Sequence, residues 1–234
     1  MFVKQLLNLP SKTFLNTKKM RILLTGANGY IGKQLIPILL NNGHEVICCV
    51  RNIESFNTRL YNSDKISAIE VDFLATKTLD IIPKDIDVAY YLIHSMASEC
   101  SNFLKAESEA AENFKEAINK TNTKQVIYLS GIVNEDKLSQ HLISRKNVEE
   151  ILSSSTYNLT TLRAGIIIGS GSASFEIIRD LVEKLPIMIA PRWLKTPSQP
   201  ISIVNILQFL VGVLQNESTY GKNFDVGGPD VITY

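Results

Sequence analysis

The chain has 234 residues, of which 45% are hydrophobic and 20% are charged, and its formal net charge at pH 7 is +1. This length permits one large domain with a substantial core or two small ones. The balanced charge, with no basic stripe interleaved with aromatic residues, argues against nucleic acid and anionic membrane surfaces as partners. The longest apolar segment, 201–214, is interrupted by polar residues and is too short to cross a bilayer, so we expect a packed helix and no membrane span.

The cysteines and histidines give no sign of a metal site. The three cysteines and three histidines lack the spacing of metal ligands, so we predict no metal. Cys48, Cys49 and Cys100 fit buried thiols of a reducing compartment, and we expect a cytoplasmic location.

The N-terminal residues 1–19 contain four lysines and no acidic residue, and they lack the long apolar region of a secretory signal. This composition permits a transit peptide or a start codon at Met20. We predict a disordered or loosely docked extension, followed by one nucleotide-binding domain over 20–234.

A short apolar strand over 22–24 leads into Thr25-Gly26-Ala27-Asn28-Gly29-Tyr30-Ile31-Gly32, and a helical pattern follows. In such a turn Gly26 permits a tight bend, Gly29 lets the backbone approach a pyrophosphate, and Gly32 lets the helix pack close to the sheet. The unpaired N–H groups at the start of the helix would bind the phosphates. We therefore predict a dinucleotide-binding loop rather than a turn that only joins two elements.

The second predicted strand, 45–50, is a near-continuous apolar run, typical of a parallel strand covered on both faces. Folds that prefer the unphosphorylated cofactor carry an acidic residue near the end of this strand, about twenty residues past the glycines. Here Arg51 occupies that place, and a guanidinium suits a 2′-phosphate. The sequence favours NADP over NAD, although a solvated Arg51 without a ligand is the alternative.

A third strand is predicted over 66–71, with Asp72 and Phe73 just past its end, where the adenine should lie. Asp72 either accepts a bond from the adenine amino group or caps the next helix. The fourth strand, 87–93, is followed by His94 and Ser95. These residues should line the cofactor groove, because open α/β sheets bind ligands at the carboxyl ends of their strands.

Helices are predicted over 101–120 and about 141–152, and strands over 124–129 and 159–162. This alternation predicts an α/β fold with a doubly wound parallel sheet, a Rossmann fold, and right-handed crossovers. Beyond Gly165 a polar turn, a helix through Leu185 and an irregular loop over 186–200 form a small C-terminal portion on the substrate side. Trp193 in that loop either walls an apolar substrate pocket or serves packing alone.

These residues resemble the extended and atypical short-chain dehydrogenase/reductases. The run Thr25-Gly-x-x-Gly-x-x-Gly32 matches the nucleotide loop of that family, and strand order and length match over 20–234. Other stretches look like a narrower branch of bacterial NAD(P)-binding proteins, often labelled epimerases or NADH-dependent reductases: 91–95, 162–165, 168–176, 191–193 and 227–230. The resemblance implies an NADP(H)-dependent oxidoreductase on a small carbonyl-type substrate, with Arg163 among the cofactor contacts and a further C-terminal domain.

Family members that perform hydride chemistry use a Tyr-x-x-x-Lys pair at the start of the fifth helix and a serine at the end of the preceding strand. Ser130 falls where the serine is expected, but the pair position reads His141-Leu-Ile-Ser-Arg145. Either His141 supplies the proton and Arg145 keeps a positive charge beside the ribose, or the site has lost this chemistry.

Three functions therefore stay open. They are an oxidoreductase, a non-catalytic NADP-binding sensor or scaffold protein, and an NAD(P)-dependent sugar epimerase or dehydratase. The last is weakened by the missing tyrosine. Family members often form dimers, and the helices that begin near 101 and 141 could pair across a homodimer.

Overall fold

A computed structural model describes residues 18–94, 103–132, 139–172, 175–176, 179–180, 183 and 197–233. The main sheet has the strand order β3-β2-β1-β4-β5-β6-β9, and every pairing in it is parallel. Its strands are β1 (Arg21–Leu24), β2 (Glu45–Val50), β3 (Ile66–Glu70), β4 (Val88–Tyr91), β5 (Gln125–Gly131), β6 (Asn158–Ala164) and β9 (Lys222–Val226).

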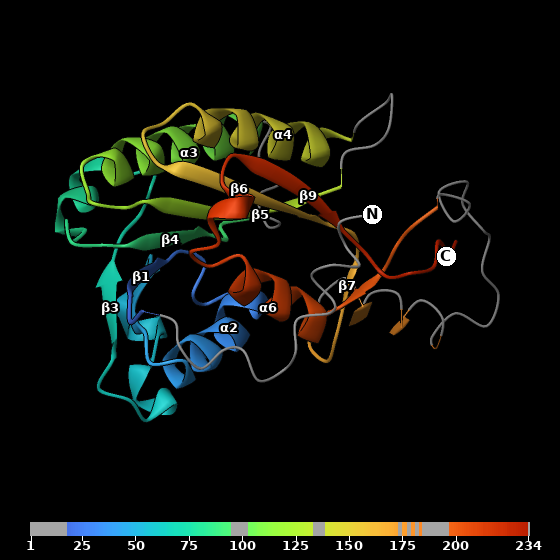
Figure 1. The fold of residues 1–234 in the computed structure, drawn as a ribbon, viewed down its shortest axis with the longest axis horizontal. Coiled ribbons are helices and arrows are strands. Elements are labelled where there is room, and N and C mark those ends of the chain that lie inside the picture. The colour runs from blue at the N-terminus through green and yellow to red at the C-terminus, as the bar shows by residue number, and fades with distance from the viewer. Residues whose placement is uncertain are drawn as a thin grey trace.

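Helices cover both faces of this sheet. Residues 175–176, 179–180 and 183 are helical, and the α-helices with described bounds are α2 (Tyr30–Asn41), α3 (Phe103–Asn119), α4 (Gln140–Ser153) and α6 (Ile203–Gly212). Helices α3 and α4 lie side by side on one face, and α2 and α6 pack together on the other (Figure 1). The predicted doubly wound parallel sheet is confirmed.

The two faces of the sheet build two separate apolar cores. In β1, Ile22 and Leu24 pack on the α2 and α6 side, and Leu23 packs on the α3 and α4 side. Cys48 and Cys49 of β2 divide between the two cores in the same way. Successive side chains of a strand point to opposite faces, so a strand buried on both sides needs a continuous apolar run, as β2 has.

The fourth strand ends earlier than the sequence predicts. β4 stops at Tyr91, because the N–H of Leu92 donates to the Thr25 side-chain Oγ1 over 3.0 Å. The same hydroxyl donates to the carbonyl oxygen of Tyr90, also over 3.0 Å. Thr25 thereby ends the pairing of β1 with β4 and fixes the segment after β4 beside the loop after β1.

The seventh strand, β9, is missing from the sequence prediction. It is an edge strand in which Val226 is the only fully buried residue, so its sequence carries little hydrophobic signal. Beside the main sheet, β7 (Ile167–Ile168) and β8 (Ile201–Ser202) form a short parallel pair. The described residues contain no helix long and apolar enough to span a membrane.

Several predictions of the sequence analysis concern residues outside the described part of the chain. They are the extension over 1–17, Ser95, Cys100, and the Trp193 loop up to residue 196.

Candidate functional site

The loop after β1 adopts the conformation that its glycines predict. Gly26 has a φ of +67°, and a Cβ added there would lie 2.6 Å from the carbonyl oxygen of Leu92. A side chain at Gly26 would therefore oppose both the backbone conformation and the close approach of the segment after β4.

Gly32 allows a close contact between α2 and the glycine loop, and not between α2 and the sheet as predicted. A Cβ at Gly32 would lie 2.4 Å from the carbonyl oxygen of Gly26, so this glycine lets α2 pack against the loop itself rather than against the sheet. The N–H of Gly29 donates to that same oxygen over 2.9 Å and closes the turn.

The start of α2 leaves backbone donors available for an anion. Gly29 is the N-cap residue and provides no side-chain cap, and the first turn of the helix contains no acidic residue. The first N–H groups of a helix have no partner within the helix, and they carry its positive dipole end. Phosphate groups bind at such helix starts.

A cavity of about 700 Å³ lies over this loop, at the carboxyl ends of β1 to β5. Its volume is within the range of about 300–1,000 Å³ that small-molecule sites occupy. The predicted site residues that line it are Thr25, Gly26, Ala27, Asn28, Gly29, Arg51, Asp72, Phe73, His94 and Arg145. Tyr30, Ile31, Gly32, Ser130, His141 and Arg163 are not in its lining. We refer to this cavity as the main pocket.

One end of the main pocket is polar and lies at β2 and β3. The side-chain amide of Asn28 donates to the Ser55 hydroxyl over 3.1 Å and joins the glycine loop to the segment after β2. Arg51 is exposed there and has no ion-pair partner among the described residues. Asp72 accepts a hydrogen bond from the N–H of Leu74 over 3.0 Å, so the local capping contact is present.

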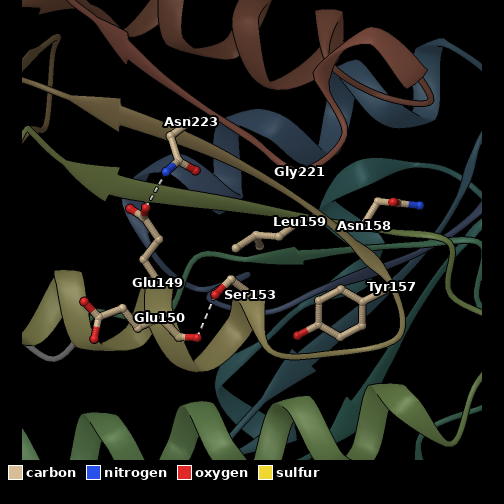
Figure 2. Close-up of a pocket in the computed structure, with 8 residues that line it drawn as sticks. All are labelled: Glu149, Glu150, Ser153, Tyr157, Asn158, Leu159, Gly221 and Asn223. Atoms are coloured by element: carbon tan, nitrogen blue, oxygen red, sulfur yellow. Dashed lines mark hydrogen bonds between the residues drawn. The ribbon is translucent and has the colours of Figure 1, made fainter.

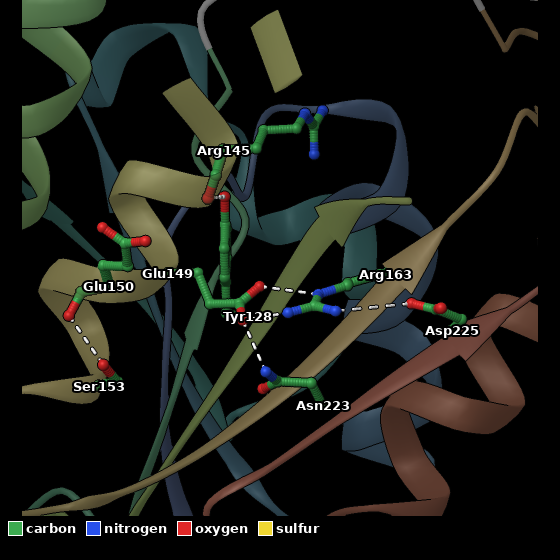
Figure 3. A network of polar contacts seen from close by, with 8 residues as sticks. All are labelled: Tyr128, Arg145, Glu149, Glu150, Ser153, Arg163, Asn223 and Asp225. Atoms are coloured by element: carbon green, nitrogen blue, oxygen red, sulfur yellow. Dashed lines mark hydrogen bonds and ion pairs between the residues drawn. The ribbon is translucent and has the colours of Figure 1, made fainter. Parts of the chain in front are cut away.

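The other end of the main pocket brings together His94, Glu107, Tyr128 and Arg145. His94 Nδ1 lies 3.4 Å from Glu107 Oε1, and the Ser144 hydroxyl donates to Glu107 Oε2. The Tyr128 hydroxyl donates to the carbonyl oxygen of Arg145 over 3.4 Å (Figure 3). Burial raises the pKa of Tyr128 to about 12, so this phenol is a neutral hydrogen-bonding group.

Two of the predicted catalytic residues lie near this end without reaching the pocket wall. Ser130 is only 2% exposed, at the end of β5. His141 is an exposed residue of the first turn of α4, and its ring packs edge-on against Phe103, with 5.1 Å between the ring centres. The His141 and His94 ring centres are 6.4 Å apart.

Arg163 of β6 takes part in a polar network on the side of β5 that is away from β4. Its Nε and Nη2 donate to the two carboxylate oxygens of Glu149 over 3.0 and 2.6 Å, which raises the pKa of Arg163. Asn223 also donates to Glu149, over 2.7 Å, and Asp225 lies 3.9 Å from Arg163 (Figure 3). The network connects α4 to β6 and to the edge strand β9.

A second, smaller cavity of about 310 Å³ lies between the end of α4 and the beginnings of β6 and β9 (Figure 2). It is lined by Glu149, Glu150, Ser153, Tyr157, Asn158, Leu159, Gly221 and Asn223. Parallel α/β sheets bind ligands at the carboxyl ends of their strands, and this cavity lies at amino ends. The main pocket is therefore the candidate functional site.

Glu107 and Tyr128 are pocket residues that the sequence analysis misses. The buried positions of α3 are Glu107, Ala110, Ala111, Phe114, Ala117 and Ile118, which form one helical stripe. A carboxylate in an otherwise apolar stripe is unusual, because an ionised group is costly to bury without partners. That pattern was the available signal for Glu107, whereas Tyr128 looks like any other buried residue of a strand.

Comparison with known proteins identifies a family for most of the chain. Residues 26–183 match the family model described as NAD(P)H-binding. Curated relatives include the chloroplastic divinyl chlorophyllide a 8-vinyl-reductases of Cucumis sativus and Arabidopsis thaliana. They are 24% and 22% identical over 229 and 243 residues, which cover 92% and 97% of this chain and 54% and 58% of theirs. The chain thus spans little more than half the length of these relatives.

Solved structures show the same fold. An epimerase from Methanothermobacter thermautotrophicus aligns with a TM-score of 0.77 and 13% identity, over 94% of this chain and 75% of its own. Yeast methylglyoxal/isovaleraldehyde reductase complexed with NADPH aligns with a TM-score of 0.75 and 16% identity, over 89% and 78%. With the glycine loop and the doubly wound sheet in place, and with the family model matching more than half of the chain, the chain belongs to the NAD(P)H-binding family.

Proposed function

We propose that this chain is an NADP(H)-dependent oxidoreductase that acts on a small carbonyl-type substrate. The observation that carries the proposal is the continuity of the main pocket, which extends from Arg51 past the glycine loop to His94, Tyr128 and Arg145. A dinucleotide laid along this path has its pyrophosphate at the start of α2, where the strand order reverses between β1 and β4.

The polar end of the pocket favours the phosphorylated cofactor. Arg51 has no carboxylate partner among the described residues, and Asn52 and Ser55, which line the same end, carry no negative charge. A guanidinium free to form charge-assisted hydrogen bonds is suited to a 2′-phosphate. Asp72 lies farther along, past β3, and its contact with Leu74 directs it toward its own turn.

The other end of the pocket provides the groups that a reduction needs. When the nicotinamide delivers a hydride, negative charge develops on the acceptor, and fixed donors or cations stabilise it. Arg145 and Tyr128 line this end, and the Arg145 guanidinium is the cation among them. The curated relatives are named as reductases of a vinyl group, so a polarised carbon–carbon double bond is a second substrate class that fits the same chemistry.

The cofactor assignment is tested by calorimetric titration of the Arg51→Ala variant with NADPH and with NADH. We expect the NADPH dissociation constant to rise by a factor equivalent to about 1–3 kcal/mol and the NADH constant to change little, because only NADPH carries the 2′-phosphate. Arg59→Ala is the matched control, since Arg59 is exposed on the same segment and does not line the pocket. Equal losses for the two cofactors would remove Arg51 from the phosphate site.

The reaction is tested by following NADPH absorbance with 4-nitrobenzaldehyde and with 2-cyclohexen-1-one, one probe for each substrate class. Consumption of NADPH with either probe supports the oxidoreductase. Tight NADPH binding without consumption would favour the non-catalytic sensor or scaffold protein. Interconversion of a nucleotide sugar with no net change in the cofactor would favour the epimerase.

We also propose that the protein works in a reducing, cytoplasmic compartment. Cys48 and Cys49 are free, buried thiols. Burial raises the pKa of Cys48 to about 12, so this thiol stays protonated and unreactive near neutral pH.

A further inference from the structure

We propose that His94 donates the proton that accompanies hydride transfer, and that Glu107 holds His94 in position for it. This inference rests on the proposed function and identifies the acid in a site that lacks the family's tyrosine. It differs from the alternative raised from the sequence in which His141 supplies the proton.

His94 lies where the reacting end of the cofactor is expected. It follows β4 directly, and the carbonyl of Leu92 in the same segment touches Gly26 of the phosphate loop. Because Arg51 is the proposed contact of the 2′-phosphate, the adenosine half of the cofactor would lie on the β2 and β3 side of the pocket. The nicotinamide half would then lie on the β4 and β5 side. His94 and Tyr128 line that half.

Glu107 is built into the wall of the pocket as a fixed carboxylate. It is 8% exposed, and its two oxygens serve different groups: Oε2 accepts from the Ser144 hydroxyl of α4, and Oε1 lies 3.4 Å from His94 Nδ1. The α3 and α4 helices pack along their length, so this carboxylate has little freedom to turn away. A buried carboxylate needs such partners to be tolerated.

This geometry assigns one ring nitrogen of His94 to Glu107 and leaves the other for the substrate. A carboxylate at Nδ1 accepts the Nδ1–H and fixes the orientation of the imidazole. A bound NADPH would supply the hydride that the carbonyl carbon takes up, and the C=O electron pair would move to the oxygen. The Nε2–H of the imidazolium protonates that oxygen. The products are an alcohol, NADP⁺ and neutral His94, which takes up a proton from solvent.

The other charged or titratable groups around His94 are less suited to the task. Tyr128 is 3% exposed, and its raised pKa makes it a weak acid near neutrality. Arg145 carries a guanidinium, which does not release a proton in proteins. His141 of α4 is exposed, is not in the pocket wall, and forms no ion pair with a carboxylate of the described residues.

The first test compares turnover of 4-nitrobenzaldehyde with NADPH binding in single variants. We expect His94→Gln to lower kcat by about 100-fold or more, and Glu107→Gln by about 10- to 100-fold, while the NADPH dissociation constant stays within about twofold. Glu107→Asp keeps the charge and should recover part of the loss. Glu109→Gln, on the exposed face of the same helix, removes the same charge and should leave kcat unchanged.

The second test reads the His94 ring directly. The chain has only three histidines, so ring ¹⁵N spectra can be assigned with single His→Gln variants. Neutral His94 should carry its proton on Nδ1 in the wild type, and Glu107→Gln should weaken that preference. This readout needs no substrate.

Normal kcat in His94→Gln would overturn the proposed acid, and an unchanged ring spectrum in Glu107→Gln would overturn the positioning role. A wild-type protein that binds NADPH but reduces neither probe would instead count against the proposed function, with the ring spectra still deciding the Glu107–His94 contact.

Discussion

At the scale of single residues, His44 makes the fold sensitive to acid. It is 1% exposed, and neither ring nitrogen has a hydrogen-bond partner among the described residues. Burial lowers the pKa of His44 below its ordinary value of 6.5, because the protonated ring would be buried without solvation. The unfolded chain therefore binds more protons than the folded protein once the pH falls below about 6.5.

Because the unfolded chain binds more protons, we expect the free energy of unfolding to fall as the pH drops below about 6.5. His44 contributes a slope of at most about 1.4 kcal/mol per pH unit. Above that pH the His44 contribution is constant. Urea denaturation of wild type and His44→Leu between pH 5 and 8 measures it, since contributions of other groups cancel in the difference. Parallel curves for the two proteins would show that His44 is not responsible.

Site residues were predictable where the signal is local. The bend at Gly26 and the position of Arg51 after β2 follow from a few neighbouring residues, and the structure places both at the main pocket. Glu107 belongs to α3, more than seventy residues after the glycine loop, and only the packed sheet brings it to His94. A pattern confined to one stretch of chain could not show that meeting.

At the scale of elements, β9 and α4 depend on each other through the Arg163–Glu149 pair. The pair is two-pronged and largely buried, with side chains 26% and 11% exposed, and Asn223 of β9 shares it. From the sequence, Arg163 is expected among the cofactor contacts because of the family resemblance. The sequence does not reveal the network, since the strand that carries Asn223 and Asp225 has too weak an apolar pattern to be predicted.

We expect a double-mutant cycle with Arg163→Met and Glu149→Gln to give a coupling of about 1–2 kcal/mol in the free energy of unfolding. The Glu112–Lys115 pair within α3, with side chains 46% and 16% exposed, is the control, and it should give about 0.3–0.5 kcal/mol. Guanidinium denaturation measures both cycles. A folded Arg163→Met protein that keeps its stability but loses NADPH affinity would instead support the cofactor contact predicted from sequence.

At the scale of the whole molecule, the cofactor should stabilise the fold by an amount that grows with the logarithm of its concentration divided by its dissociation constant. A ligand that binds only the folded protein adds about 2.7 kcal/mol at a concentration 100 times its dissociation constant. For a domain of this size we expect the melting temperature to rise by roughly 5–11 °C with NADPH, and by less with NADH at equal concentration. Differential scanning fluorimetry measures the shifts.

Gly29→Asp is the control for this shift, because a carboxylate at the start of α2 would repel the pyrophosphate. Its melting temperature should not respond to either cofactor. A normal rise with NADPH in this variant would mean that the dinucleotide does not bind at the glycine loop.

The fold class was the most predictable property, since apolar runs and helical stripes alternate along most of the chain. The sequence could not predict how the sheet ends at its edge and how its helices pack together. The strand β9, the early end of β4 at Thr25, and the packing of α6 on α2 all depend on contacts between distant residues.

The contact between α2 and α6 also has a kinetic consequence. Until residues 203–212 have been made, the face of the sheet that carries Ile22, Leu24 and Cys48 lacks one of its two covering helices. At about 5–20 residues per second, a ribosome needs roughly 10–40 s to proceed from the end of β1 to the end of α6. Throughout that interval the nascent chain presents an unfinished apolar surface, so we expect synthesis, more than refolding of the finished protein, to be the stage at which chaperones bind it.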